Sequence, residues 1–159
     1  MSERARALAQ QFERTNEDFV AVLETLSNTD WQARCEPEGW PVGFTAHHVG
    51  RWHGGIAAWV RAVATGQPPS MTRAEVDQTN NREFAERSTY SREEVVARLR
   101  HEAEDVARFV RTLTDEQLDR AGPAFLESAW NPRAEDIIVR ILIDHISHHA
   151  ASIKAATSR

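Results

Sequence analysis

The last helical segment of the chain reads IIVRILIDHISHHAASI over residues 137–153. Its apolar residues occupy more than one face of a helix, which is typical of a helix that is central in a domain or lies at a subunit interface. One stripe, at steps of three or four residues, includes two histidines; its members are Ile138, Leu142, His145, His149 and Ile153. We therefore expect His145 and His149 to point into the protein and not into solvent.

Helical spacing of apolar residues also occurs in three earlier segments, and no segment shows the alternation of a strand. The expected helices cover residues 8–26, 40–65 and 91–113, and the last runs from residue 131 to near the C-terminus. Loops are expected over residues 31–39 and around Gly122. Proline at position 41 suits the first residue of the second helix, and Asn131 with Pro132 suits the start of the fourth.

A longer connection separates the second and third helices. Within residues 70–90, Thr72 and Glu75 form a capping box, and only Val76 and Phe84 are strongly apolar. This pattern predicts a short, thinly packed helix. The sequence therefore predicts an all-α protein, a four-helix bundle with a longer middle connection that contains a short helix, in a single domain over residues 1–159.

Composition excludes several classes of protein. The chain has 159 residues, of which 41% are hydrophobic and 27% charged, as in a globular domain. Nineteen basic and 24 acidic residues give a net charge of −5, which argues against a nucleic-acid binder with a basic face. Cys35 is the single cysteine, so no internal disulfide can form. The first twenty residues carry charges throughout, and no apolar run approaches about 20 residues, so we expect a cytoplasmic protein that does not enter the membrane.

The histidines are the residues most informative about function. His145 and His149 are four residues apart, a spacing at which two imidazoles can converge on one ion. On the second helix, His48 lies on the stripe of Trp52 and Ile56, whereas His47 lies about 100° away and is expected to be exposed. Three inward imidazoles from two helices would form a divalent-metal site in the bundle core, with one coordination position left for water or substrate.

Structural roles are the alternative for each of these residues. A single inward histidine is more often a hydrogen-bonded core residue than a ligand, and an i,i+4 pair also occurs by chance. His148 can pair with Asp144 on the helix surface. His53 is poorly angled toward the site, and His101 is expected to be solvated. Cys35 is expected to be incidental, since a nucleophilic thiolate needs a neighbouring base or cation.

Two stretches resemble motifs of the DinB-like superfamily. Residues 40–49, WPVGFTAHHV, resemble its second-helix motif, in which a tryptophan begins the helix and a metal-binding histidine follows eight residues later. The resemblance therefore assigns His48, and not His47, as a ligand. The stretch HISHH is similar to the fourth-helix motif, and its metal-binding positions correspond to His145 and His149. The metal-binding domain of mycothiol-dependent maleylpyruvate isomerase is similar and belongs to the same superfamily.

The resemblance implies a four-helix bundle that binds one divalent ion, often zinc or nickel, usually as a homodimer. Some members are thiol S-transferases that use mycothiol, bacillithiol or glutathione. The favoured hypothesis is a metal-dependent thiol S-transferase that acts on a small electrophile. Hydrolysis by metal-bound water is an alternative, with Asp144 and Glu127 as candidate bases. A non-catalytic metal-binding module in a stress response is a third possibility.

Overall fold

The computed structural model describes residues 1–69, 71–123, 126 and 130–158. Most of them are helical, which confirms the all-α prediction. The elements in chain order are α1 (Glu3–Thr25), α2 (Asn28–Gln32), β1 (Arg34–Cys35), β2 (Trp40–Pro41), α3 (Val42–Ala64), α4 (Arg73–Glu86), α5 (Arg92–Arg111), α6 (Asp115–Asp119), α7 (Ala134–Ile137), the π-helical segment η1 (Ile138–Ile143) and α8 (Asp144–Thr157).

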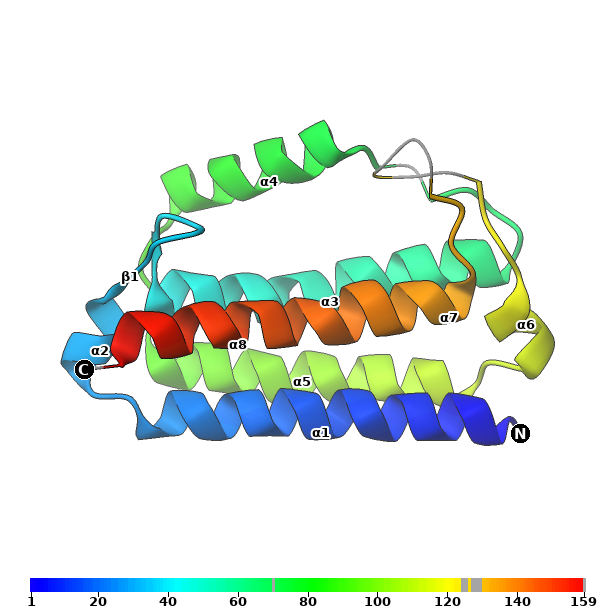
Figure 1. Ribbon diagram of the computed structural model, residues 1–159, viewed down its shortest axis with the longest axis horizontal. Helices are drawn as coiled ribbons and strands as arrows, with labels where there is room; N and C mark the ends of the chain where they lie inside the picture. The colour runs from blue at the N-terminus through cyan, green and yellow to red at the C-terminus, as the bar shows by residue number, and fades with distance from the viewer. Residues whose placement is uncertain (70, 124–125, 127–129, 159) are drawn as a thin grey trace.

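Four long helical rods lie side by side, as Figure 1 shows: α1, α3, α5 and the continuous rod of α7, η1 and α8. Helix α1 packs against α5, and α3 packs against both α5 and the last rod. Helix α4 lies apart from these rods, above α3 in the view of Figure 1. Among the described residues, no helix combines the length and the apolar character needed to span a lipid bilayer.

The core is built from the stripes that the sequence predicts. On α1 the buried stripe includes Phe12, Phe19 and Leu23, and on α5 it includes Leu99 and Val110. The last rod is central, because six of its isoleucine and leucine side chains are buried inside the chain itself: Ile137, Ile138, Leu142, Ile143, Ile146 and Ile153. By contrast, α4 has no buried residue, in agreement with its few apolar side chains, although its 14 residues make it longer than expected.

Helix α3 begins later than predicted. Its first residue is Val42, and Pro41 is the N-cap, with an extended backbone at φ −60° and ψ 150°. Trp40 and Pro41 form strand β2, which pairs antiparallel with β1 in the register Cys35 to Trp40. This pairing requires extended backbone, so the helix cannot start before residue 42. The expected loop over residues 31–39 therefore contains the end of α2, strand β1 and the turn between the two strands.

The last rod also begins later than predicted, at Ala134 in place of Asn131. The backbone before it pairs with the segment that follows α6: the Gly122 amide donates to the Pro132 carbonyl at 2.9 Å, and the Ala134 amide donates to the Arg120 carbonyl at 3.0 Å. These bonds keep residues 131–133 out of the helix. The rod then passes through six π-helical residues, Ile138–Ile143, before α-helical geometry resumes.

Candidate metal centre

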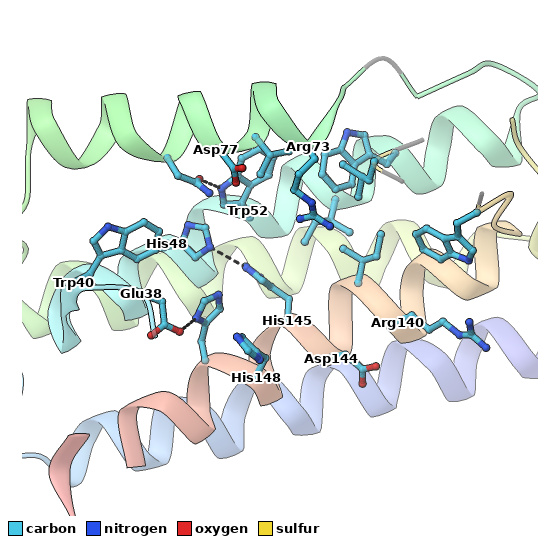
Figure 2. Close-up of a pocket in the computed structure, with 18 residues that line it drawn as sticks. Glu38, Trp40, His48, Trp52, Arg73, Asp77, Arg140, Asp144, His145 and His148 are labelled. Atoms are coloured by element: carbon cyan, nitrogen blue, oxygen red, sulfur yellow. Dashed lines mark hydrogen bonds and ion pairs between the residues drawn. The ribbon is translucent and has the colours of Figure 1, made fainter. Parts of the chain in front are cut away.

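Three histidines from two helices converge at the place the sequence predicts. His48 lies near the start of α3, and His145 and His149 lie on successive turns at the start of α8. Figure 2 shows His48 and His145 facing each other across the gap between the two helices. The ring centroids of the three imidazoles form a nearly regular triangle, with separations of 4.9 Å from His48 to each of the others and 4.7 Å between His145 and His149.

These separations fit a common ligand. Imidazole nitrogens bind zinc at about 2.0–2.1 Å, which places the centroids of neighbouring rings about 5 Å apart. The Nε2 atoms of His48 and His145 are 3.0 Å apart. If both nitrogens bound one ion at those bond lengths, the angle at the ion would be roughly 95°. One potential ligand atom from each of the three histidines lies within 4.8 Å of the others, so the group could hold a metal ion.

Burial favours the neutral imidazoles that a metal requires. It lowers the pKa of His48 and of His145 well below the usual value, and the neighbouring histidines lower both further. Burial also lowers the pKa of His149, an effect that the hydrogen bond to Glu38 opposes. Neutral imidazole is the metal-binding form, because a protonated ring has no free lone pair.

Glu38 is a fourth residue of the site that the sequence analysis does not identify. It lies in the turn between β1 and β2, and its Oε1 accepts a hydrogen bond from Nδ1 of His149 at 2.8 Å. The side chain is only 7% exposed, and among the described residues its Oε2 has no hydrogen-bond partner. With its proton on Nδ1, His149 keeps the lone pair on Nε2. Because the hydrogen bond depends on how the β1–β2 turn lies over α8, sequence spacing gives no signal for it.

A second set of side chains shares one histidine with the first. Glu38, His148 and His149 also bring three potential ligand atoms within 4.8 Å of one another. His149 belongs to both sets and is buried. His148, which only the second set contains, is exposed, whereas His48, which only the first set contains, is buried. The carboxylate of Glu38 is already engaged by His149, so the three-histidine set is the better defined of the two.

A cavity of about 740 Å³ opens beside the three histidines. Figure 2 shows it between α4 on one side and α3 with the last rod on the other. Besides Glu38 and the three histidines, it is lined by Trp40, Trp52, Ile56, Trp59, Arg73, Val76, Asp77, Asn80, Leu126, Trp130, Arg140, Ile141, Asp144 and His148. Trp52 of α3 and Glu38 of the β1–β2 turn therefore face the same space, and the cavity has the size of a small-molecule site.

The other histidines lie outside the triangle. The prediction that His47 is exposed is wrong: it is 6% exposed and stacks on Tyr90, with ring centroids 3.7 Å apart. His53 is fully buried in the core, where its Nε2 lies 2.8 Å from Oδ1 of Asn16. His148 and His101 are exposed, as expected.

Three further residues from the sequence analysis, Cys35, Asp144 and Glu127, differ in outcome. Cys35 is buried, and burial raises the pKa of its thiol, so it lacks the activated thiolate that a nucleophile needs. Of the two candidate bases, Asp144 lines the cavity. Glu127 lies outside the described residues.

The fold and the site together define a class: a helical bundle in which three converging imidazoles from two helices could hold a metal ion beside a small-molecule cavity. Residues 11–153 match the family model of the DinB superfamily, and the chain belongs to that superfamily. Comparison with curated proteins and with solved structures finds no significant match.

Proposed function

We propose that the protein binds one divalent ion, zinc or nickel, through the Nε2 atoms of His48, His145 and His149. The observation that carries this proposal is the nearly regular triangle of three imidazoles, with ring centroids 4.7–4.9 Å apart. Three protein ligands leave at least one coordination position open, as in catalytic metal sites. The neighbouring cavity gives a small molecule access to that position.

The activity we propose is thiol S-transfer from a low-molecular-weight thiol, such as mycothiol, bacillithiol or glutathione, to a small electrophile. A divalent ion in this site would lower the pKa of the thiol, since a coordinated thiol is deprotonated. The sulfur then forms a bond to the electrophilic carbon, the leaving group departs with the bonding electron pair, and the thiol proton passes to solvent. This balance needs no oxidant or reductant.

The residues of the chain orient and shield the reactants. Glu38 fixes His149 in the tautomer that leaves Nε2 free for the ion. Trp40 packs against His48, with ring centroids 5.0 Å apart, and restricts the rotation of that imidazole. Trp40 and Trp52 lie beside His48 and would reduce the hydration of the sulfur, which favours its attack on carbon.

Hydrolysis is a second candidate, supported by the position of Asp144. This carboxylate lines the same cavity and directly precedes His145 in the chain, where it could accept a proton from a water molecule. The two activities differ in one requirement: S-transfer needs an added thiol, and hydrolysis does not.

The experiment is a conjugation assay on protein purified without a histidine tag and loaded with zinc or nickel. Each of the three thiols is tested against a panel of chloro-substituted electrophiles, and the thioether product is detected by mass spectrometry. We expect thiol-dependent conjugation that is lost in His149→Ala and kept in His101→Ala, whose side chain is distant from the site. Turnover without thiol would favour hydrolysis, and no turnover of either kind in a metal-loaded protein would contradict both activities.

A further inference from the structure

The cavity extends from the three histidines along one stripe of α3. His48, Trp52, Ile56 and Trp59 follow one another at steps of four, four and three residues, and all four line the cavity. At a rise of 1.5 Å per residue, the helix from His48 to Trp59 is about 16 Å long. The histidines therefore lie at one end of an elongated space. We call the rest of this space the aromatic chamber; its apolar lining residues are Trp52, Ile56, Trp59, Val76, Leu126, Trp130 and Ile141.

The indole and aliphatic side chains of the aromatic chamber offer flat apolar surface. The indole N–H of Trp52 donates to Oδ1 of Asn80 at 2.8 Å, so this polar group is already satisfied by α4. The rings of Trp52 and Trp59 have centroids 5.6 Å apart at an interplanar angle of 41°. Trp52 and Ile56 are 4% and 2% exposed, so they line the deep part of the cavity.

The charged side chains that line the cavity nearly cancel. Asp77 and Asp144 contribute two negative charges, and Arg73 and Arg140 contribute two positive charges. The remaining carboxylate, Glu38, adds one negative charge at the histidine end, where it accepts a hydrogen bond from His149. Because the other four charges balance, recognition in the rest of the cavity rests on the apolar wall.

We propose that the aromatic chamber binds the electrophile, and that this substrate is an uncharged, flat aromatic molecule. Indole rings hold such a molecule by stacking and edge contacts, for which a saturated ring of similar size is a poorer partner. The chamber directs the reactive carbon toward the three histidines. The assignment of the substrate as an electrophile rests on the proposed function, whereas binding of an aromatic molecule in the chamber can be measured without metal or turnover.

The test uses 1,3-dinitrobenzene, an uncharged, planar and unreactive probe, and nitrocyclohexane as the non-aromatic comparison. Binding is measured by isothermal titration calorimetry on the full chain, with chelator and again with zinc. We expect one molecule of 1,3-dinitrobenzene to bind per chain in both conditions, and nitrocyclohexane to bind about two- to tenfold more weakly.

Two variants locate the probe. Ile141→Trp fills the chamber with a larger side chain and is expected to weaken probe binding about tenfold or more. Val139→Trp makes the same kind of change at another half-buried aliphatic residue of η1, which does not line the cavity, and is expected to leave binding unchanged. Trp59→Leu, which removes one stacking surface, is expected to weaken binding about two- to tenfold.

The outcomes separate this inference from the metal site. Absence of saturable binding to the wild-type chain, or equal binding of the probe by wild type and Ile141→Trp, would overturn the inference. Equal affinity for the aromatic and the saturated probe would overturn it as well. Probe binding in a chain that takes up no zinc or nickel would support the chamber and contradict the proposed function.

Discussion

Nδ1 of His149 lies 2.8 Å from Oε1 of Glu38, and both side chains are more than nine-tenths buried. A turn between two short strands thereby fixes the orientation of an imidazole on the last helix. Partners of this kind orient metal-binding histidines and raise their basicity, and their loss typically costs 10–100-fold in metal affinity.

The first prediction tests Glu38. We expect Glu38→Ala to weaken zinc binding about 10–100-fold while the helical content is retained. Affinity is measured by competition with a chromophoric chelator. Glu36→Ala is the control, since Glu36 lies in the same turn but is exposed. Equal zinc affinities for Glu38→Ala and wild type would show that the hydrogen bond does not support metal binding.

The second prediction identifies the ligand set. Purified wild-type protein should contain about one ion per chain, measured by plasma mass spectrometry, because the three imidazoles could hold one ion. His48→Ala and His145→Ala are expected to lose it, whereas His148→Ala is expected to retain it. The opposite pattern, with loss in His148→Ala alone, would place the ion among Glu38, His148 and His149.

The third prediction concerns metal removal. We expect chelation to leave the far-ultraviolet circular dichroism of the protein nearly unchanged, because α1 and α5 pack through large buried side chains and without any of the three histidines. Thermal unfolding would occur at a lower temperature, since the ion stabilises only the folded state. Loss of helicity on chelation would instead indicate a structural ion and favour a non-catalytic module.

The fourth prediction uses the buried His53. Burial lowers its pKa to about 3, so the folded chain keeps this imidazole neutral while the unfolded chain protonates it below about pH 6.5. The free energy of unfolding should therefore fall as the pH drops from 6.5 toward 3, by up to about 1.4 kcal/mol per pH unit from this one group. Above pH 6.5 the contribution is constant.

Urea unfolding of chelated protein at several pH values measures this slope. In His53→Leu we expect a slope that is shallower by up to one proton between pH 6 and 4. His101→Leu is the control, because the side chain of His101 is 74% exposed. Equal slopes in wild type and His53→Leu would mean that His53 takes up its proton without unfolding.

The fifth prediction compares two glycines of α3. A Cβ atom at Gly43 would lie 2.5 Å from Nε1 of Trp31, whose indole donates to the Tyr90 carbonyl. We expect Gly43→Ala to lower the free energy of unfolding by about 1–3 kcal/mol. At Gly54 the nearest atom is the flexible carboxylate of Glu102, at 3.1 Å, so Gly54→Ala should stabilise the chain by about 0.5–1 kcal/mol. Denaturant titration measures both changes, and equal effects of the two variants would contradict the argument.

The sequence predicts the helices and their buried stripes because local spacing alone decides which side chains share a face. The same spacing brings His145 and His149 together. Spacing alone does not predict the burial of His47. That burial arises because α3 is covered on several sides and because Tyr90, from the segment before α5, stacks on the imidazole. Burial on a central helix depends on its neighbours as well as on its own period.

Hydrogen bonds between distant backbone segments explain why two helices begin later than the sequence predicts. Helices α3 and α7 begin at residues 42 and 134 because the residues before them form hydrogen bonds with distant backbone.

Helices α2 and α6 are missing from the sequence prediction although each has a visible capping box, Ser27 with Asp30 and Thr114 with Gln117. Their five-residue length gives too few positions for a period to emerge. Glu38 depends on a turn whose position over α8 no local rule specifies.

Helix α4 forms one wall of the cavity without a single buried residue. Its contacts with the bundle include the Arg51–Glu83 ion pair, the Trp52–Asn80 hydrogen bond and the packing of Phe84 against Phe44, with ring centroids 4.9 Å apart. Segments with so little buried surface open locally at a small fraction of the global free energy of unfolding. Access to the site and stability of the fold are therefore governed by different parts of the chain. Native-state hydrogen exchange should be much faster in α4 than in α3, and the opening rate of this helix can change through evolution without weakening the bundle.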